Sequence, residues 1–200
     1  MENGNPLPHR NIDASPAASD RALQAALHDY ARRWPAEAGC VDDFLVLLAD
    51  HDDPFVRERL AGHFTASAWL VDRGGTRILL THHRKLGLWL QLGGHADGDR
   101  DLARAALREA EEESGLAGLR VVPGVFDLDR HRIPEHKGVP AHWHHDVRYV
   151  VRAGDDENFV VSHESHTLAW RDIASLARDE GADASLRRMA VKWLEHPASA

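Results

Sequence analysis

Four glutamates crowd one predicted helix of this 200-residue chain. Glu109, Glu111, Glu112 and Glu113 lie within five consecutive positions. Because side chains at i, i+3 and i+4 share one face of a helix, Glu109, Glu112 and Glu113 point the same way and Glu111 points away. Like charges at this spacing cost a few tenths of a kcal/mol per pair. Either solvent or a bound cation must offset that repulsion.

The neighbours of these glutamates favour a cation. Their face lies in line with apolar positions of the same helix, such as Leu102, so it borders a packing stripe. Carboxylates beside a packed surface need partners. Arg108 can pair with Glu112 at i+4, whereas no basic residue stands at helical spacing from Glu109 or Glu113 within the predicted helix. A hard divalent cation with oxygen ligands fits that position, whereas a fully solvated acidic face is the ordinary alternative.

Histidines are the second group that could do chemistry, since the chain holds 15 of them. His142, His144 and Asp146 alternate on one face of a predicted strand. Alternating histidines can bind a transition metal or contact phosphate. A solvent-facing strand in a histidine-rich protein is the alternative that stays open.

The elements that must position these side chains alternate between helix and strand. Apolar periodicity predicts helices at 19–34, 40–50, 54–63, 99–114 and 184–196. Strand-like runs lie at 63–72, 76–83, 142–153 and 166–173, with a short apolar run at 86–92. Arg73-Gly74-Gly75 predicts a hairpin turn, and Gly115 closes the acidic helix. The pattern predicts an α/β or α+β fold, with one sheet covered by helices.

Composition bounds the class of protein. The length suits one domain with an extra segment, and 43% hydrophobic with 28% charged residues indicates a globular chain. The formal net charge of −8 argues against nucleic-acid duplexes and anionic membranes as partners. The one cysteine, Cys40, excludes an internal disulfide and a cysteine-cluster zinc site. Neither a signal peptide nor a membrane span is predicted, so we expect a soluble, cytoplasmic protein.

Residues 94–116 resemble the Nudix box of the Nudix hydrolase family. That signature is a glycine, five residues, a glutamate, seven residues, Arg-Glu, an aliphatic residue, any residue, Glu-Glu, any residue, glycine and an aliphatic residue. The positions that match are Gly94, Arg108, Glu109, Glu112, Glu113, Gly115 and Leu116, with Ala110 as a small aliphatic residue. The order of strands around the box, from about 62 to 185, also resembles a Nudix domain.

The resemblance implies a fold, a division of the chain and an activity. The expected fold is a Nudix-like mixed β-sheet sandwiched between helices, with an N-terminal helical extension. The expected division is a flexible tail at 1–18, a helical segment at 19–61 and a Nudix hydrolase domain at 62–200. The implied activity is hydrolysis of a diphosphate linkage in a nucleoside diphosphate derivative, with Mg²⁺ or Mn²⁺ as cofactor.

The resemblance also implies roles for particular residues. Glu109, Glu112 and Glu113 would bind the metal, and the backbone carbonyl of Gly93 or Gly94 would be a further ligand. Arg108 would orient the glutamates. Metal ions held in this way polarise a phosphoryl oxygen and lower the pKa of bound water. An acidic protein can then bind an anionic substrate.

Arg100 is the one departure from the box, because the family has a glutamate there. That glutamate generally pairs with the box arginine, so Arg108 needs another partner. Three carboxylates could replace it: Asp99, Asp101 or Glu112. The departure motivates the alternative of a catalytically weak or inactive Nudix-like nucleotide-binding sensor. An isoprenoid diphosphate isomerase shares the fold but needs a catalytic cysteine beside its metal, and Cys40 lies outside the core domain.

The remaining candidates are basic residues and one late acid. Candidate contacts to the substrate are Arg84, Lys85, His95, His142 and His144, although Arg84 and Lys85 could equally form a solvated turn. Glu164 stands where some Nudix enzymes carry an additional acid or catalytic base. Loops such as 127–141 and the N-terminal helices are expected to select the substrate. Those apolar helices could also form a homodimer surface.

Overall fold

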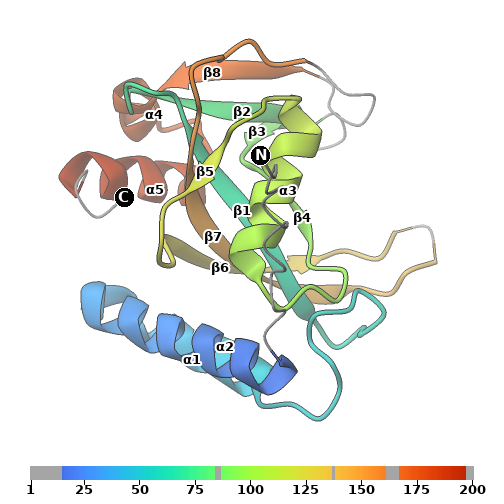
Figure 1. Ribbon diagram of the computed structural model, residues 1–200. Coiled ribbons are helices and arrows are strands. Elements are labelled where there is room, and N and C mark those ends of the chain that lie inside the picture. The colour runs from blue at the N-terminus through green and yellow to red at the C-terminus, as the bar shows by residue number, and fades with distance from the viewer. Residues whose placement is uncertain (1–14, 84–86, 137, 161–166, 197–200) are drawn as a thin grey trace, which may run out of the picture.

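One eight-stranded mixed sheet forms the centre of the protein, with helices on both of its faces (Figure 1). The computed structural model describes residues 15–83, 87–136, 138–160 and 167–196. The strands are β1 (His63–Val71), β2 (Arg77–His83), β3 (Leu88–Leu90), β4 (Leu92–His95), β5 (Arg120–Val121), β6 (Asp127–Ile133), β7 (His142–Arg152) and β8 (Leu168–Asp172). The helices are α1 (Pro16–Arg33), the 3-10 helix η1 (Pro35–Glu37), α2 (Ala38–Leu48), α3 (Leu102–Ser114), α4 (Ile173–Arg178) and α5 (Ala184–Glu195). None of the helices in the described ranges is long and apolar enough to cross a lipid bilayer.

β1 is the central strand of the sheet. It runs parallel to β7 and antiparallel to β2 and β4. Farther out, β3 and β8 pair with β2, while β5 and β6 pair with β7. Because side chains alternate along a strand, Ala68 and Leu70 pack with Ala110 of α3, whereas Trp69 and Val71 pack with α4 and α5. The prediction of a mixed sheet between helices is confirmed.

The acidic helix is α3, and local chemistry fixes both of its ends. The side chain of Asp101 accepts a hydrogen bond from the backbone N–H of Arg104 at 3.1 Å, which caps the N-terminus. Gly115 ends the helix in the left-handed conformation, with φ of 68°, as its position predicts. The buried side chains of α3 are Leu102, Ala105, Ala106, Ala110 and Ser114. Their packing sets the rotation of the helix and hence the direction of its glutamates.

The N-terminal helices α1 and α2 lie beside the beginning of β1 and of α3 (Figure 1). Leu27, Tyr30 and Phe44 of these helices join one buried cluster with Phe64 of β1 and Leu102 of α3. The apolar stripe of the first helix is therefore covered within a single chain. A homodimer stays a prediction.

A buried ion network ties this N-terminal segment to the last helix. Lys192 of α5 is only 4% exposed. Its ammonium group donates to Tyr30 at 2.9 Å, to Glu37 at 3.0 Å and to the fully buried Asp127 at 2.8 Å. Asp127 also accepts from Arg148 at 3.2 Å. Buried charges persist in a fold when each one is paired in this way.

The predicted helix at 54–63 is wrong, because residues 54–62 form a series of turns. The carboxylate of Asp53 accepts the Phe55 N–H at 3.0 Å, which is a local alternative to helical bonding. The Pro54 carbonyl accepts the N–H of Phe64 at 2.8 Å, which ties the segment to the beginning of β1. Gly62 has φ of 143°, outside the helical range.

Candidate active site

Two glycines let β4 approach the acidic helix. A Cβ atom on Gly94 would collide with the carboxylate of Glu109, and one on Gly93 would collide with Ser67 of β1. Glycine is therefore required at Gly93, where the backbone of Ala66 and Ser67 also lies too close, whereas at Gly94 it makes room for the Glu109 side chain. As a result, the Glu109 carboxylate lies directly against the β4 backbone.

The three glutamates of the α3 face differ in burial. Glu109 is half-buried, with its side chain 18% exposed. Glu113 is also half-buried, and its carboxylate accepts the N–H of Gly93 at 3.1 Å. Glu112, which shares their helix face, is exposed. The structure thus brings Glu109, Glu113 and the Gly93-Gly94 backbone together, with Glu112 at the solvent side.

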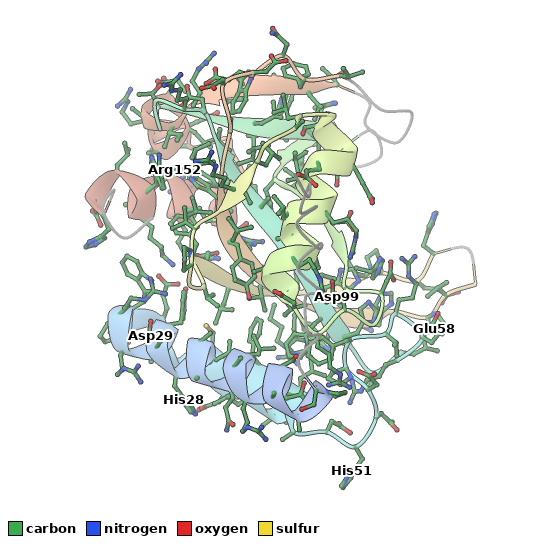
Figure 2. All side chains as sticks on the ribbon, in the orientation of Figure 1. His28, Asp29, His51, Glu58, Asp99 and Arg152 are labelled. Atoms are coloured by element: carbon green, nitrogen blue, oxygen red, sulfur yellow. The ribbon has the colours of Figure 1, made fainter. Side chains whose placement is uncertain are left out.

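Arg108 pairs with residues other than Glu112. Its guanidinium donates to the carbonyl of His95 at 3.1 Å and to Glu109 at 3.2 Å, and it lies 3.7 Å from Asp99. Asp99, which Figure 2 labels beside the N-terminal end of α3, is thus a carboxylate neighbour of Arg108, although its hydrogen bonds go to Arg104 at 2.7 and 2.9 Å. The expected i+4 pair with Glu112 is not formed, because Arg108 turns toward β4.

Arg100 turns away from the box and toward the N-terminal segment. Its guanidinium lies 2.6 Å from the carboxylate of Asp20 on α1 and 3.2 Å from that of Asp53. It also covers the ring of Phe55, with 4.7 Å between the guanidinium carbon and the ring centroid. The residue that departs from the box therefore joins the N-terminal helices to the rest of the fold.

The electrostatics at Glu109 suit a bound cation. Burial raises the pKa of its carboxyl, the ion pair with Arg108 opposes that shift, and the charges of Glu112 and Asp97 raise it further. A cation would reverse the effect of burial. The nearby donors are carboxylate and carbonyl oxygens, which is the ligand set that Mg²⁺ and Mn²⁺ prefer.

The candidate histidines gather on the other face of the sheet. His142 and Asp146 are buried and His144 is half-buried, so the alternative of a solvent-facing strand is wrong. Asp146 is held by Thr65 and Ser67 hydroxyls at 2.9 to 3.0 Å. Burial, before any other cause, lowers the pKa of His144 to about 2.

His95 lies beside the strand histidines and at the end of the Gly-Gly strand. Burial and the charge of Arg57 lower its pKa to about 4, so the imidazole is neutral near neutral pH. The structure also adds two residues that the sequence analysis did not select, His63 and His131. The available signal for His63 was a row of polar residues at alternate positions of an otherwise apolar strand.

Three candidates cannot be placed. Arg84, Lys85 and Glu164 lie outside the described residues, so their roles stay predictions. Cys40, which an isomerase would need beside its metal, is half-buried on α2 and packs against the cluster of the N-terminal helices. It lies on α2, before the range expected for the Nudix domain.

Comparison with solved structures identifies the fold. A NUDIX-family hydrolase from Clostridium perfringens is 22% identical, with a TM-score of 0.53, and the match covers 66% of this chain and 96% of that protein. A C. elegans Ap4A hydrolase is 18% identical, with a TM-score of 0.53, and the match covers 68% of this chain and 98% of that protein. The E. coli dihydroneopterin triphosphate pyrophosphohydrolase is 16% identical, with a TM-score of 0.53, and the match covers 66% of this chain and 95% of that protein. At these identities the likeness concerns the fold, which confirms the expected Nudix-like architecture.

Comparison of the sequence with known families is more specific. No curated protein matches the chain. The NUDIX domain family model matches residues 62–193, well over half of its length. This range contains the acidic helix, the Gly-Gly strand and all eight strands of the sheet. The chain therefore belongs to the NUDIX domain family, that of the Nudix hydrolases.

Proposed function

We propose that this protein is a divalent-metal-dependent hydrolase that cleaves a diphosphate linkage in a nucleoside diphosphate derivative. One observation carries the proposal: α3 holds Glu109 and Glu113 against the glycine backbone of β4, with Glu112 on the same helix face. Burial and the negative charges of Glu112 and Asp97 disfavour the ionised form of Glu109, and a bound cation would offset both effects.

Mg²⁺ or Mn²⁺ fits the residues that are present. Glu109, Glu112, Glu113 and the carbonyl of Gly93 would hold it, and all of them offer oxygen. The bound ion would supply charge neutralisation at the phosphoryl oxygens and a more acidic water. Arg108 is the positioning residue, because it ties Glu109 to the β4 backbone through the carbonyl of His95.

The chemistry of the substrate follows from the charge of the site. A diphosphate carries dense negative charge, and this site and the whole chain, at −8, are also acidic. The two are compatible only when cations lie between them. Arg84 and Lys85 are proposed phosphate contacts, and Glu164 is a proposed general base.

Two of the structural neighbours support the same class of linkage. One is an Ap4A hydrolase and the other a dihydroneopterin triphosphate pyrophosphohydrolase. The name of each protein refers to a compound with several linked phosphates. This is consistent with a phosphoanhydride as the bond to be cleaved. The base and the sugar of the substrate would be selected outside the box, by the connection that follows β6, since residues 127–133 form that strand and not the loop that was expected.

The sensor alternative loses its main support. It rested on Arg100 and on the loss of a partner for Arg108. Arg108 has Asp99 as a carboxylate neighbour at 3.7 Å, and Arg100 has a separate role at the N-terminal helices. The hydrolase is therefore the function that the geometry supports best.

A product assay across a panel of nucleoside diphosphate derivatives tests the proposal, with Mg²⁺ or Mn²⁺ present. We expect two phosphorylated products from at least one substrate, and no release in excess chelator. Glu109→Gln should remove most of the turnover. Glu111→Gln is the matched control, because Glu111 is exposed and lies on the other side of the same helix. Substrate binding without hydrolysis by the wild type would overturn the proposal in favour of the sensor.

A further inference from the structure

Four neighbouring strands bring histidines onto one face of the sheet. His63 of β1 is the register partner of His144 of β7, and His144 is the partner of His131 of β6. On the other side of β1, His95 of β4 lies opposite Thr65, two residues from His63 on the same face. The cluster is therefore created by strand pairing between segments that are far apart in the sequence.

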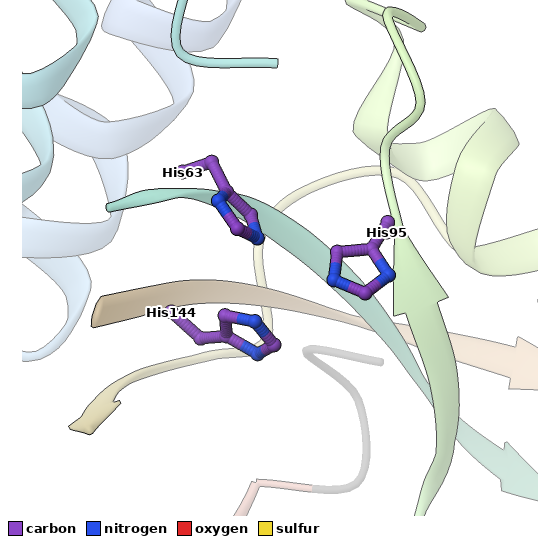
Figure 3. Close-up of side chains that lie close together, drawn as sticks. All are labelled: His63, His95 and His144. Carbon is purple, nitrogen blue, oxygen red and sulfur yellow. The ribbon is translucent and has the colours of Figure 1, made fainter. Parts of the chain in front are cut away.

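Three of these imidazoles converge, as Figure 3 shows. One ring nitrogen from each of His63, His95 and His144 lies within 4.8 Å of the others. The ring centroids are 4.9 to 5.2 Å apart. His142 adds a fourth ring, stacked on His63, and its Nε2 atom is 3.2 Å from Nε2 of His144.

His63 carries a buried nitrogen without a hydrogen-bond partner. The residue is 2% exposed, and its Nδ1 lies 3.2 Å from the carbonyl oxygen of Arg59. Because a carbonyl only accepts, the proton is on Nδ1 and Nε2 holds a free lone pair. Among the residues that the structure describes, Nε2 has no hydrogen-bond partner. A buried lone pair of this kind is unfavourable unless a donor or a metal ion binds it.

The surroundings keep the imidazole rings of the cluster neutral and in a fixed tautomer, which is the form that binds metal. In His142 the Nδ1 atom lies 2.8 Å from the carbonyl of Pro140, which fixes the same tautomer as in His63. Hydrogen bonds of this kind orient histidine ligands in metal proteins. Burial also lowers the pKa of His63 and His144, so both are neutral near neutral pH.

We propose that His63, His95 and His144 form a transition-metal site, separate from the glutamate site, that takes Zn²⁺ or a similar divalent ion. Imidazole nitrogen suits zinc, copper, nickel and iron, and is a poor ligand for Mg²⁺. Three histidines leave the fourth position of a tetrahedral ion for an oxygen ligand, which is the arrangement of catalytic zinc sites.

The distances are compatible with such an ion. Two nitrogen ligands of a tetrahedral zinc centre, with bonds of about 2.0–2.1 Å, lie about 3.3 Å apart. The nitrogens of His63, His95 and His144 lie within 4.8 Å of one another. Side-chain rotations that move each nitrogen by about an ångström would bring them to the distances of a zinc centre. A cluster held only by N–H···N bonds is the competing explanation, but it leaves Nε2 of His63 unpaired.

The site differs from the glutamate site in position as well as in ligand type. Along β4, Gly94 faces Glu109 of α3, whereas the next residue, His95, points to the opposite face of the strand. The donors are nitrogens on one face and oxygens on the other. Metals of different hardness should therefore load the two sites independently, whether or not the protein hydrolyses a diphosphate.

A Co²⁺ titration of the metal-free full-length protein tests this proposal, because the visible spectrum of Co²⁺ reports tetrahedral nitrogen coordination. We expect one equivalent to bind in excess Mg²⁺ and to be displaced by Zn²⁺. His144→Gln should weaken that binding by at least about 10- to 100-fold. Glu109→Gln should leave it unchanged.

Matched controls separate this site from non-specific binding. His28 and His51 are exposed on the outer side of the N-terminal segment (Figure 2), so His28→Gln and His51→Gln should bind Co²⁺ like the wild type. If His144→Gln does not fold, Zn²⁺-dependent shifts of the ring nitrogens in the wild type, observed by NMR, replace it. Absence of tetrahedral Co²⁺ binding, or its persistence in a folded His144→Gln, would overturn the proposal.

Discussion

Arg100→Ala should loosen the N-terminal helices while leaving the chemistry of the site intact. Arg100 contacts Asp20 at 2.6 Å and Asp53 at 3.2 Å, and it covers the ring of Phe55. All three contacts belong to the N-terminal segment, and none involves a glutamate of α3. The substitution therefore removes a link between two parts of the fold.

The size of the effect follows from how exposed these groups are. The side chain of Arg100 is 23% exposed, and those of Asp20 and Asp53 are 32% and 42% exposed. An exposed ion pair contributes about 0.2–1 kcal/mol, and a buried charged hydrogen bond about 1.5–3 kcal/mol. The cation–π contact adds about 0.5–1 kcal/mol. We expect Arg100→Ala to lower the free energy of unfolding by about 1.5–3 kcal/mol.

Urea unfolding measures this loss, and Arg32→Ala is the matched control. Arg32 pairs with Asp29 at 2.9 Å but is 70% exposed, so its removal should cost less than about 0.5 kcal/mol. Arg100→Glu, which restores the residue typical of the family, would place a third carboxylate beside Asp20 and Asp53 and should destabilise more than alanine. Unchanged stability of Arg100→Ala with an altered Mg²⁺ requirement would refute this reasoning and place Arg100 at the metal site.

Three further predictions concern the metal site, the core and pH. Glu112→Gln should lose most of the turnover, because a proposed metal ligand is removed. Its melting temperature should be equal or higher, because one like charge is removed from the helix face. Turnover equal to that of Glu111→Gln would contradict the role of Glu112 as a ligand. Asp127→Asn should lower the free energy of unfolding by about 3–5 kcal/mol, since the buried Lys192 and Arg148 each lose one carboxylate charge that pairs with them, and urea unfolding will show it. Stability should fall from pH 7 to pH 5 by up to about 2 kcal/mol for His145 alone, because burial lowers its folded pKa to about 4 and the unfolded chain, near 6.5, takes up the proton first. His145→Gln should flatten that pH dependence, and an equally steep curve in the variant would exclude His145 as its source.

Local signals made much of the fold predictable. The acidic helix was predicted from its apolar stripe and from Gly115, and its N-terminus was off by three residues, because Asp101 and not an earlier residue caps it. The hairpin between β1 and β2 followed from Gly74-Gly75. The helix expected at 54–63 failed because Asp53 offers the backbone a competing bond that periodicity does not detect.

Features that depend on contacts between distant segments were not predictable. The family motif identified Glu109, Glu112 and Glu113 as a group, but the sequence did not show that Arg100 would meet Asp20 on a helix 80 positions earlier. His63 was missed for the same reason. Its significance comes from register pairing with His144 and from the approach of β4, and neither is encoded within a short window of sequence.

A Mn²⁺-soaked crystal with a non-hydrolysable diphosphate analogue tests the central claim most directly, because anomalous scattering locates manganese without reference to activity. The account predicts manganese bound to Glu109, Glu112 and Glu113 beside the carbonyl of Gly93, in contact with the phosphate oxygens of the analogue. Manganese absent from these carboxylates, with the analogue bound elsewhere on the protein, would contradict it.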